Sequence, residues 1–414
     1  MKIIYIHQYF NTPRMTGGTR SFEMARRLVA MGHEVHIVTS SRDHSSSKDS
    51  YFTREEGINV HWIPVAYSNK YGDINRIFAF LKFAWGATIK GISLQGDVVF
   101  ATSTPLTVAL PGYLVSRKLS VPMVFEVRDL WPILPIAIGS LKNPLLQWLA
   151  FKLERFAYVN SSRIVALSEG MKEGVVATGY DPDKVSVIPN SCDLDLFNVD
   201  DKVNRSLDFR ARNNIPNDAI LVVYAGTFGR INGVDYLVNL ADRLKDLPNI
   251  QFLAIGDGAE FDKITELAQS RGVLGKNFLI LGGVSKLEMV NVLAAADLAT
   301  SLFIPLEEME ANSANKFFDA LAAGCPILIN YGGWQAKLLI VNEAGMQLDR
   351  DISVPADQMR MLLSSPDRIG SWGFNSRKLG ELNFSRDELA IELEQVLSKA
   401  VNESDRSYRV KTDG

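Results

Sequence analysis

The chain has 414 residues, of which 47% are hydrophobic and 22% charged, and its formal net charge is -3. This length exceeds what one hydrophobic core usually organises, so we expect two domains of roughly 200 residues each. The ordinary globular composition and the small negative charge give no basic footprint for DNA or RNA, and we expect no nucleic acid as a partner.

The N-terminal segment MKIIYIHQYF lacks the layout of a signal peptide. We also find no unbroken apolar run of the roughly 18 residues that a membrane-spanning helix needs. The two cysteines, Cys192 and Cys325, lie far apart in the chain. Together these features favour a reducing cytoplasm.

The first half of the chain alternates short β-branched runs with amphipathic helices. The helix expected in RSFEMARRLVAMG places Phe22, Ala25, Leu28 and Val29 on one face, and Gly32 ends it. The runs expected as strands are KIIYIHQ, EVHIVTS, DVVFATS, PMVFEV, RIVALS and KVSVIPN. This alternation is typical of a parallel sheet with crossover helices.

The second half repeats the pattern in AILVVYAGTF, IQFLAIGDG, NFLILGGV, LATSLF and PILINYGG. Between the halves, NVDDKVNRSLDFRARNNIPND is polar and lacks apolar periodicity, so we expect the boundary within residues 196–216. We therefore predict an α/β protein of two doubly wound, Rossmann-like domains facing a central cleft, because open α/β sheets bind ligands beyond the carboxyl ends of their strands.

Histidine is confined to one end of the chain, at positions 7, 33, 36, 44 and 61. The C-terminal half therefore cannot build a histidine metal site or a histidine-containing triad. His33 and His36 flank a predicted strand, and we interpret them as surface or structural residues. His7 ends the first strand and faces the expected cleft.

Three glycine-containing loops follow predicted strands: RMTGGTRS, AGTFGRINGV and AIGDGAE. Each one alone fits a tight turn as well as a binding loop. Neither half carries G-x-G-x-x-G after its first strand or a Walker lysine motif, which argues against a dinucleotide dehydrogenase or a kinase. Backbone N–H groups near helix N-termini suit a diphosphate without a dedicated metal.

A series of motifs spans nearly the whole chain: GGTRSFEMARRLVAMGHEVHIVT, RDLWP, VIPNSCDLDLF, AGTFGRINGVDYL, IGDGAE, GGVSKLEMVNVLAAADL and NKFFDALAAGCPIL. Their order resembles the family 4 glycosyltransferases, group 1 type, with the GT-B fold. RDLWP and the lysine before FFDALAAG resemble the fucosamine-transferase-like subgroup of O-antigen and capsule transferases. Such enzymes move a sugar from a nucleotide-sugar to an acceptor, and the nucleotide lies mainly on the C-terminal domain.

The resemblance implies a division of the chain. Residues 1–198 form the acceptor-side domain and residues 199–384 the nucleotide-sugar-binding domain. Residues 385–401 form a helix that crosses back to the first domain, and we expect residues 402–414 to be a disordered tail. The donor is a substrate, so we expect no cofactor.

The resemblance also assigns residues of the donor site. Gly17 and Gly18 let the backbone approach the diphosphate and the transferred sugar. Asn315 lies in the nucleotide helix, which we expect to begin near Ser313, and Asp319 matches the second acid of the family's paired-glutamate motif, a carboxylate suited to the two ribose hydroxyls. The segments that line the base are matched by Gly256, Asp257, Gly258 and Val284.

The sequence departs from the family pattern at three positions. Ala311 replaces the first paired glutamate, while Thr227 and Asn232 stand where many relatives carry the arginine and lysine that neutralise the diphosphate. Lys316, in the first turn of the helix predicted in SANKFFDALAAGCP, can supply the missing charge. The helix dipole opposes a cation there by only about 0.3 to 1 kcal/mol, and a bound diphosphate would reverse the penalty. Arg230 is the second candidate cation.

Charged residues outside the nucleotide helix, most of them acidic, have several interpretations. Arg128 and Asp129 end a predicted strand where many relatives carry a histidine near the sugar, and Asp129 either accepts the acceptor's proton or holds a sugar hydroxyl. Glu307, Glu308 and Glu310 either touch the sugar or form a solvated loop. The D-x-D spacing of residues 193–195 resembles a metal motif of another fold, but its place in the interdomain stretch indicates turn structure, and we expect no metal.

An aromatic and basic stretch covers residues 74–94. It contains Phe78, Phe80, Phe83 and Trp85 with Arg76, Lys82 and Lys90. The pattern fits a helix on the inner face of the plasma membrane, and core packing explains the aromatic residues equally well.

The family resemblance implies a metal-independent transferase of the hexosyltransferase type, and we expect it in the cytoplasm. The subgroup resemblance further implies a nucleotide-sugar, UDP-linked and carrying an N-acetylated deoxy sugar, and a glycan or undecaprenyl-linked acceptor in bacterial surface polysaccharide synthesis. Two alternatives stay open: a nucleotide-sugar epimerase of the same fold, and a non-catalytic nucleotide-sugar-binding partner.

Overall fold

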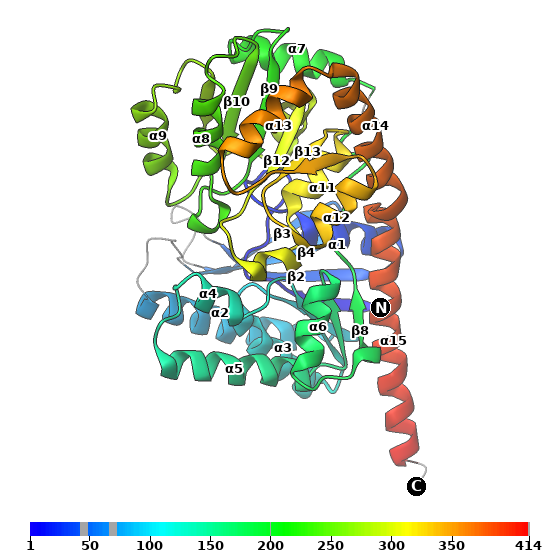
Figure 1. Ribbon diagram of the computed structural model, residues 1–414. Helices are drawn as coiled ribbons and strands as arrows, with labels where there is room; N and C mark the ends of the chain where they lie inside the picture. The colour runs from blue at the N-terminus through cyan, green and yellow to red at the C-terminus, as the bar shows by residue number, and fades with distance from the viewer. Residues whose placement is uncertain (42–48, 66–72, 199, 413–414) are drawn as a thin grey trace. The chain divides into compact units, whose positions relative to one another are not determined.

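The computed structural model of the chain describes residues 1–41, 49–65, 73–198 and 200–412, without the side chains of 73–76 and 406–412. His44 and the side chain of Arg76 therefore lie outside the described residues. Contacts divide the chain into two compact units (Figure 1). The first contains Met1–Thr12, Thr19–Pro189 and Asp387–Gly414, and the second contains Pro13–Gly18 and Asn190–Arg386.

The first unit is built on an eight-stranded sheet in the order β3-β4-β2-β1-β5-β6-β7-β8. Every neighbouring pair is parallel except β3 with β4, which form an antiparallel edge that the sequence analysis did not anticipate. The strands are β1 Lys2–Ile6, β2 Glu34–Ser41, β3 Tyr51–Glu55, β4 Ile58–Pro64, β5 Val98–Thr102, β6 Met123–Val127, β7 Arg163–Ala166 and β8 Val185–Val187.

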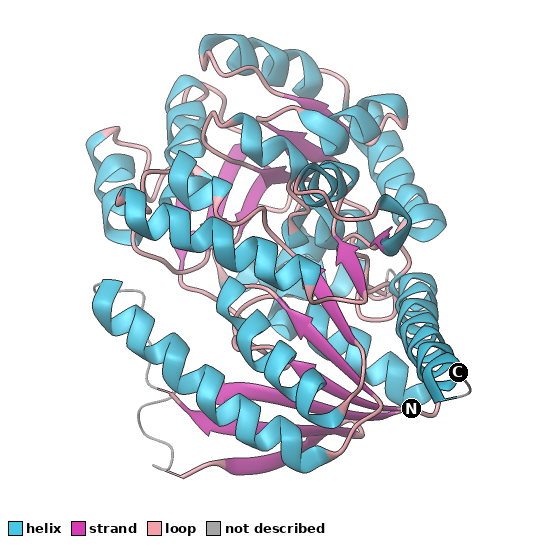
Figure 2. Cartoon of the chain, turned by 90° about the horizontal axis from the view of Figure 1, so that it is seen from below, coloured by secondary structure: helices cyan, strands magenta, loops and turns pink. Residues whose placement is uncertain are grey.

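Helices cover both faces of this sheet, because successive strand residues point to opposite sides. Ile4 and Ile6 pack with Phe83 on one face, while Ile3 and Tyr5 pack with Leu393 on the other. Figure 2 shows these strands as a twisted fan under helices. The helices are α1 Arg20–Ala30, α2 Asp73–Leu94, α3 Ala109–Leu119, α4 Ile133–Ala137, α5 Pro144–Val159, α6 Glu169–Ala177 and α15 Arg386–Thr412, with single turns η1 Leu106–Val108 and η2 Pro182–Lys184.

The second unit is built on a parallel six-stranded sheet in the order β11-β10-β9-β12-β13-β14. Its strands are β9 Ile220–Ala225, β10 Ile250–Ile255, β11 Phe278–Leu281, β12 Leu298–Ser301, β13 Ile327–Ile329 and β14 Gly345–Gln347. Its helices are α7 Lys202–Arg212, α8 Asp235–Arg243, α9 Phe261–Ser270, α10 Lys286–Ala295, α11 Asn315–Ala322, α12 Gly333–Val341, α13 Ser353–Leu363 and α14 Pro366–Asn383, with η3 Arg230–Asn232 and η4 Glu307–Ala311. The prediction of two doubly wound α/β domains is confirmed.

The division of the chain differs from the sequence boundaries at 198/199 and 384/385. The units separate between Pro189 and Asn190 and again between Arg386 and Asp387. The polar segment interpreted as a linker contains α7, which belongs to the second unit because Arg210 donates to the carbonyl of Ala295 and to Asp297. Helix α7 can therefore pack against the second unit with few apolar residues, because the buried Arg210 guanidinium makes these contacts.

The C-terminal helix is also longer than expected. It continues to Thr412, whereas the sequence analysis ended it at residue 401 and expected a disordered tail. Glu403 accepts from Arg163 of β7 at 2.6 and 3.1 Å, so a buried guanidinium anchors the extended part of the helix. Residues 413–414 lie outside the described residues.

Candidate functional site

Two of the glycine loops in the second unit pack backbone against backbone. The amide of Phe228, after β9, donates to the carbonyl of Asp257, after β10, at 2.8 Å, and the amide of Glu260 donates to the carbonyl of Phe228 at 2.9 Å. A Cβ atom on Gly256 would collide with the carbonyl oxygen of Gly226. Only glycine permits this approach, which explains the glycine at position 256.

The predicted base-lining residues lie together at these loops. Gly256, Asp257 and Gly258 form the turn between β10 and α9. The Asp257 carboxylate accepts from the amide of Gly283 at 3.0 Å, directly before Val284. Adjacent strand ends thus bring four sequence-predicted residues into one loop cluster.

Lys316 lies in the first turn of α11 and is half-buried. Its Nζ lies 4.7 Å from the ring centroid of Tyr224 and 4.9 Å from that of Phe303. It donates to Asn232 Oδ1 at 2.9 Å, with longer contacts of 3.4 Å to Tyr224 Oη and 3.5 Å to the carbonyl oxygen of Leu302. Burial lowers the pKa of Lys316 to about 7.

Asn232, one of the residues that depart from the family pattern, thus contacts Lys316, the residue expected to supply the missing positive charge. Asn232 is buried at the end of η3, and its carboxamide meets the ammonium that comes from α11. Thr227 and Arg230, in contrast, are exposed. Two of the three Lys316 contacts are longer than good hydrogen bonds, so two N–H groups remain available to an anion.

Asp319, one turn further along α11, points to different partners. Its carboxylate forms an ion pair with Lys286 at the start of α10, and Lys286 Nζ also lies 3.7 Å from Asp193 Oδ2. Asp193 is fully buried and accepts from Arg386. Burial raises the pKa of Asp319, while the Lys286 ammonium opposes that rise.

This network also shows the role of Asp193, the first residue of the D-x-D spacing. Asp193 is a structural acceptor of Arg386, and its carbonyl accepts from Leu196 and Phe197 in a turn. The turn predicted for residues 193–195 is therefore present. Sequence reasoning missed Lys286, because its partners lie far away in the chain.

The start of α11 is held by a residue of the stretch before Asp193. The amide of Asn190 donates to Ser313 Oγ at 3.0 Å, and its side chain donates to the carbonyl of Ser313 at 2.5 Å. The helix begins at Asn315 rather than at Ser313, whose hydroxyl and carbonyl oxygens both accept from Asn190. A Cβ atom on Gly18 would lie 2.8 Å from Asn315 Nδ2, so Gly17 and Gly18 belong to this neighbourhood.

The acidic residues before α11 lie in the short helix η4. Glu307 is exposed and Glu308 half-buried. A Cβ atom on Gly332, which precedes α12, would lie 2.8 Å from Glu310 Oε1. Glu310 therefore lies beside a helix N-terminus, where the dipole favours a carboxylate.

Residues at three neighbouring strand ends of the first unit form a second cluster. Arg128, after β6, lies with Nη1 3.3 Å from Nε2 of His7, which follows β1. The amide of Arg128 donates at 3.0 Å to Ser103 Oγ, after β5. Burial raises the pKa of the neighbouring Asp129 to about 6, although the Arg128 charge lowers it.

A buried ion pair supports this strand end. Glu126 accepts from Arg20 Nε at 3.0 Å and Nη2 at 2.9 Å, and both side chains are fully buried. Burial raises the pKa of Glu126, but the charges of Arg20 and Arg128 outweigh burial and hold that pKa below its ordinary value. Sequence analysis missed this pair because its members lie in separate elements.

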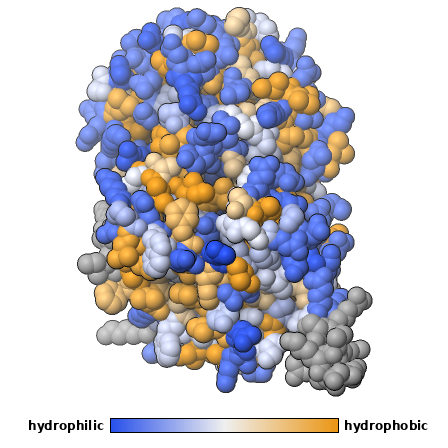
Figure 3. All heavy atoms as spheres, turned by 60° about the horizontal axis from the view of Figure 1, so that its bottom comes forward, coloured by the Kyte–Doolittle hydropathy of each residue, from blue (hydrophilic) through white to orange (hydrophobic). Residues whose placement is uncertain are grey.

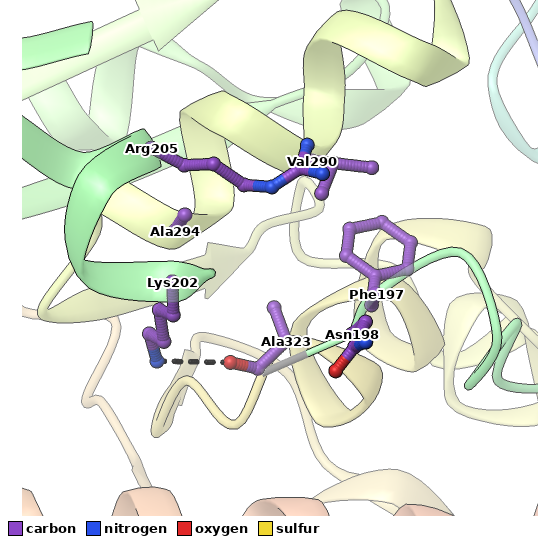
Figure 4. A pocket seen from close by; sticks show the side chains of 7 residues that line it. All are labelled: Phe197, Asn198, Lys202, Arg205, Val290, Ala294 and Ala323. Carbon is purple, nitrogen blue, oxygen red and sulfur yellow. Dashed lines mark hydrogen bonds between the residues drawn. The ribbon is translucent and has the colours of Figure 1, made fainter. Parts of the chain in front are cut away.

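A small hollow lies at the other end of α11 (Figure 4). Its volume of about 10 Å³ suffices for one water molecule. Lys202 donates from its rim to the carbonyl of Ala323 at 2.9 Å, which caps the end of the helix. The hollow is lined by Phe197, Asn198, Lys202, Arg205, Val290, Ala294 and Ala323, and it is too small for a sugar.

An apolar face covers α2 and α5 of the first unit. On α2 the exposed residues follow helical spacing, and Trp85 is 71% exposed. On α5 Trp148 is 56% exposed. Orange side chains gather among blue ones on the face that Figure 3 brings forward. We define the apolar face as Ile77, Phe78, Leu81, Trp85 and Ile89 of α2 with Leu145, Trp148, Leu149 and Phe151 of α5.

The segment Ile77–Leu94 of α2 is long and apolar enough to cross a membrane, with a mean hydropathy of 1.3. The sequence analysis had found no such segment because it required an unbroken apolar run. Phe83 and Ala87 of this helix are buried in the core of the first unit. One side of α2 is therefore packed against protein.

Comparison with known families decides the class of the protein. Residues 16–191 match the family described as glycosyl transferase 4-like domain, and residues 206–378 match glycosyl transferases group 1. The chain carries the two domains of a group 1 glycosyltransferase. The coarse resemblance inferred from the motifs is confirmed.

This glycosyltransferase is similar to a protein of Escherichia coli strain K12 assigned to colanic acid biosynthesis as glycosyl transferase WcaI. The identity is 25% over 297 residues, covering 68% of this chain and 72% of the relative. It is 24% identical over 283 residues to the phosphatidylinositol N-acetylglucosaminyltransferase GPI3 subunit of Saccharomyces cerevisiae strain YJM789. That match covers 67% of this chain and spans 57% of the relative's length.

Solved structures share the GT-B fold of this glycosyltransferase. Sucrose-phosphate synthase from Thermosynechococcus elongatus superposes with a TM-score of 0.75 at 18% identity, covering 96% of this chain and 98% of that one. Anabaena Alr3699/HepE, solved in complex with UDP and glucose, superposes with a TM-score of 0.68 at 16% identity, covering 96% and 100%. The predicted GT-B fold is confirmed.

Proposed function

We propose that this glycosyltransferase moves a sugar from a UDP-linked donor to a glycan or lipid-linked glycan acceptor during synthesis of a bacterial surface polysaccharide. The observation that carries the proposal is the position of the Lys316 ammonium, 2.9 Å from Asn232 beside the glycine loop. The colanic acid assignment of one relative supports the pathway class, and the UDP bound to Alr3699/HepE supports the nucleotide.

The second unit binds the donor in this proposal. Backbone amides after β9 and the Lys316 ammonium hold the diphosphate, and Asp319 accepts from the ribose hydroxyls. As the bond between the sugar carbon and the diphosphate oxygen breaks, negative charge grows on the leaving group. Lys316 stabilises that charge more strongly than the charge of the bound donor, which lowers the barrier.

The first unit supplies the acceptor side. Asp129 receives the proton of the attacking acceptor hydroxyl, and its neighbour Arg128 lies against the sugar. The pKa of Asp129, raised to about 6 by burial, suits a group that accepts a proton near neutral pH. The donor sugar is an N-acetylated deoxy hexose, as in the fucosamine-transferase-like subgroup that the motifs resemble.

Transfer proceeds without a divalent cation in this proposal. The D-x-D carboxylate Asp193 is bound by Arg386 and lies close to Lys286, and Lys316 provides a positive charge for the diphosphate. Activity should therefore persist in excess EDTA. Loss of activity that manganese restores would contradict this part of the proposal.

The enzyme works on the cytoplasmic side of the plasma membrane in this proposal, with the apolar face against the bilayer. Lys82 lies beside the exposed row of α2, and Lys152 lies 5.6 Å from the ring of Trp148 on α5. Aromatic and basic residues on one surface are typical of interfacial helices. A lipid-linked acceptor would then be presented at the same membrane.

A donor screen tests the proposal. UDP, GDP and dTDP sugars are compared by thermal shift, and a ligand at a hundred times its dissociation constant should stabilise the fold by about 2.7 kcal/mol. Binding donors are then incubated with and without a lipid-linked glycan acceptor. Transfer only with acceptor supports the proposal, whereas epimerisation without acceptor, or binding with neither reaction, would assign one of the two alternatives.

A further inference from the structure

Four alternating charges form a chain through the second unit. Arg386 donates to Asp193, Lys286 Nζ lies 3.7 Å from Asp193 Oδ2, and the same ammonium binds Asp319 Oδ1. The side chains of Asp193 and Lys286 are 0% and 7% exposed, and that of Asp319 is 14% exposed. The Arg386 end of this chain of charges is buried, and Asp319 is its most solvent-accessible member.

The contact with Lys286 leaves the Asp319 carboxylate able to bind a ligand. A carboxylate offers about four lone-pair sites on its two oxygens, and Lys286 occupies one site on Oδ1. The remaining sites suffice for two hydroxyl donors. Lys286 itself is enclosed, because the ring of Phe197 lies 5.3 Å from its Nζ.

We propose that Lys286 is a positioning residue that holds the Asp319 carboxylate in the orientation and charge state that bind the two ribose hydroxyls of the donor. The proposal rests on the nucleotide-sugar function proposed above. The proposal adds Lys286 as the residue that allows Asp319 to distinguish ribose from deoxyribose. Lys286 does not touch the nucleotide.

The surrounding charges give Lys286 an effect that simple packing would not have. Burial raises the pKa of Asp319, the Lys286 and Arg386 charges lower it, and the Asp193 charge raises it. Cys192, whose thiol donates to the carbonyl of Phe318, is a further titratable neighbour of Asp319. Without Lys286 the pKa of Asp319 should rise further, so ribose binding should weaken as pH falls.

The experiment compares UDP with 2′-deoxyUDP by calorimetry on the full chain. A hydroxyl donating to a carboxylate is a charge-assisted bond, so the wild type should bind UDP about tenfold to a hundredfold more tightly than 2′-deoxyUDP. Lys286→Met should lose most of this preference. Lys286→Arg should keep most of it, because the guanidinium can still bind the carboxylate.

Lys202→Met is the matched control. Lys202 also binds α11, but through the carbonyls of Ala323 and Gly324 at the opposite end of the helix. This variant should keep the wild-type preference for UDP even where its melting temperature falls. Lys286→Gln, which retains a neutral hydrogen-bond donor, replaces Lys286→Met in the experiment if Lys286→Met does not fold. Its preference for UDP over 2′-deoxyUDP should also be lower than that of the wild type.

A cycle with Asp319→Ala completes the test. Asp319→Ala should lose the preference for UDP, and adding Lys286→Met should change it no further, since the two residues act through one contact. Lys286→Met should also show UDP affinity that declines toward acidic pH more steeply than in the wild type. Equal loss of affinity for both nucleotides, or an unchanged preference, would assign Lys286 a structural role only and overturn the proposal.

The outcome for the proposed donor is read separately. If the wild type binds no UDP, the UDP assignment is wrong, and the same comparison is made with GDP and 2′-deoxyGDP. Lys286 is then judged by the same criterion. A wild type that transfers sugar yet shows no preference for the ribonucleotide would overturn the role of Lys286 and leave the transferase function intact.

Discussion

The Lys316 ammonium donates to Asn232 Oδ1 across 2.9 Å, although the two residues lie in different elements of the second unit. Asn232 stands where the family resemblance implies a lysine in many relatives. Lys316, at the start of α11, is the cation that we propose takes the place of that lysine.

The first prediction concerns the chemical step. Lys316→Met should lower kcat on the order of ten- to a hundredfold, because a charge-assisted hydrogen bond contributes roughly 1.5 to 3 kcal/mol and is strongest in the transition state. The donor KM should change less. Nucleotide release by purified variants measures both constants. The control is Lys263→Met, since Lys263 is exposed and pairs with Glu260. Wild-type kcat in Lys316→Met would make Lys316 a structural residue.

The second prediction moves the charge back to the loop. The double variant Asn232→Lys with Lys316→Met should recover about tenfold of the lost kcat, because the new ammonium starts beside the place that Lys316 vacates. Asn232→Lys alone should lower the melting temperature, since two ammonium groups would then meet at a buried site. A double variant no better than Lys316→Met would show that the origin of the charge on α11 matters.

Most parallel strands were predictable because each is a short β-branched run followed by a helix. The sequence analysis missed β3, β4 and β14. The edge strand β3 is mostly exposed and lacks a clean alternation, and β14 is three residues long without a β-branched residue. Of the site, the glycine loops and α11 were identified from local patterns. Lys286, Glu126 and Arg20 were not, because each acquires its role through a charge distant in sequence. The contact of Lys316 with Asn232 was missed for the same reason, although both residues had been singled out.

The third prediction is a pH profile. Because burial lowers the pKa of Lys316 to about 7, the ammonium of the free enzyme loses its proton as pH rises through that value. A neutral amine cannot balance a diphosphate, so kcat/KM should fall above pH 7, approaching tenfold per pH unit. Lys316→Arg should flatten this limb, since arginine stays charged. An unchanged basic limb in Lys316→Arg would assign the titration to another group.

The fourth prediction concerns Asp129. A base must be ionised, and burial raises the pKa of Asp129 to about 6, so kcat/KM should fall as pH drops below about 6. Asp129→Asn should remove this acid limb and lower kcat by roughly a hundredfold or more. His7, which lies beside Arg128, is the neighbour to control for, and the limb should persist in His7→Asn. An Asp129→Asn enzyme that keeps most of its turnover would assign Asp129 to holding a sugar hydroxyl.

The last prediction concerns the apolar face of α2 and α5. Lys82→Glu with Lys90→Glu should lower binding to anionic vesicles at low salt by at least about thirtyfold, since each basic residue near a charged bilayer contributes roughly 1 kcal/mol. Trp85→Ser with Trp148→Ser should weaken binding at high salt as well, because the loss of buried apolar area is not screened. Phe374→Ser is the control, as Phe374 is 71% exposed on α14 of the second unit. Co-sedimentation that responds to the lysines but not to the tryptophans would make the contact purely electrostatic. Unchanged co-sedimentation in both double variants would leave this face without a role at the membrane.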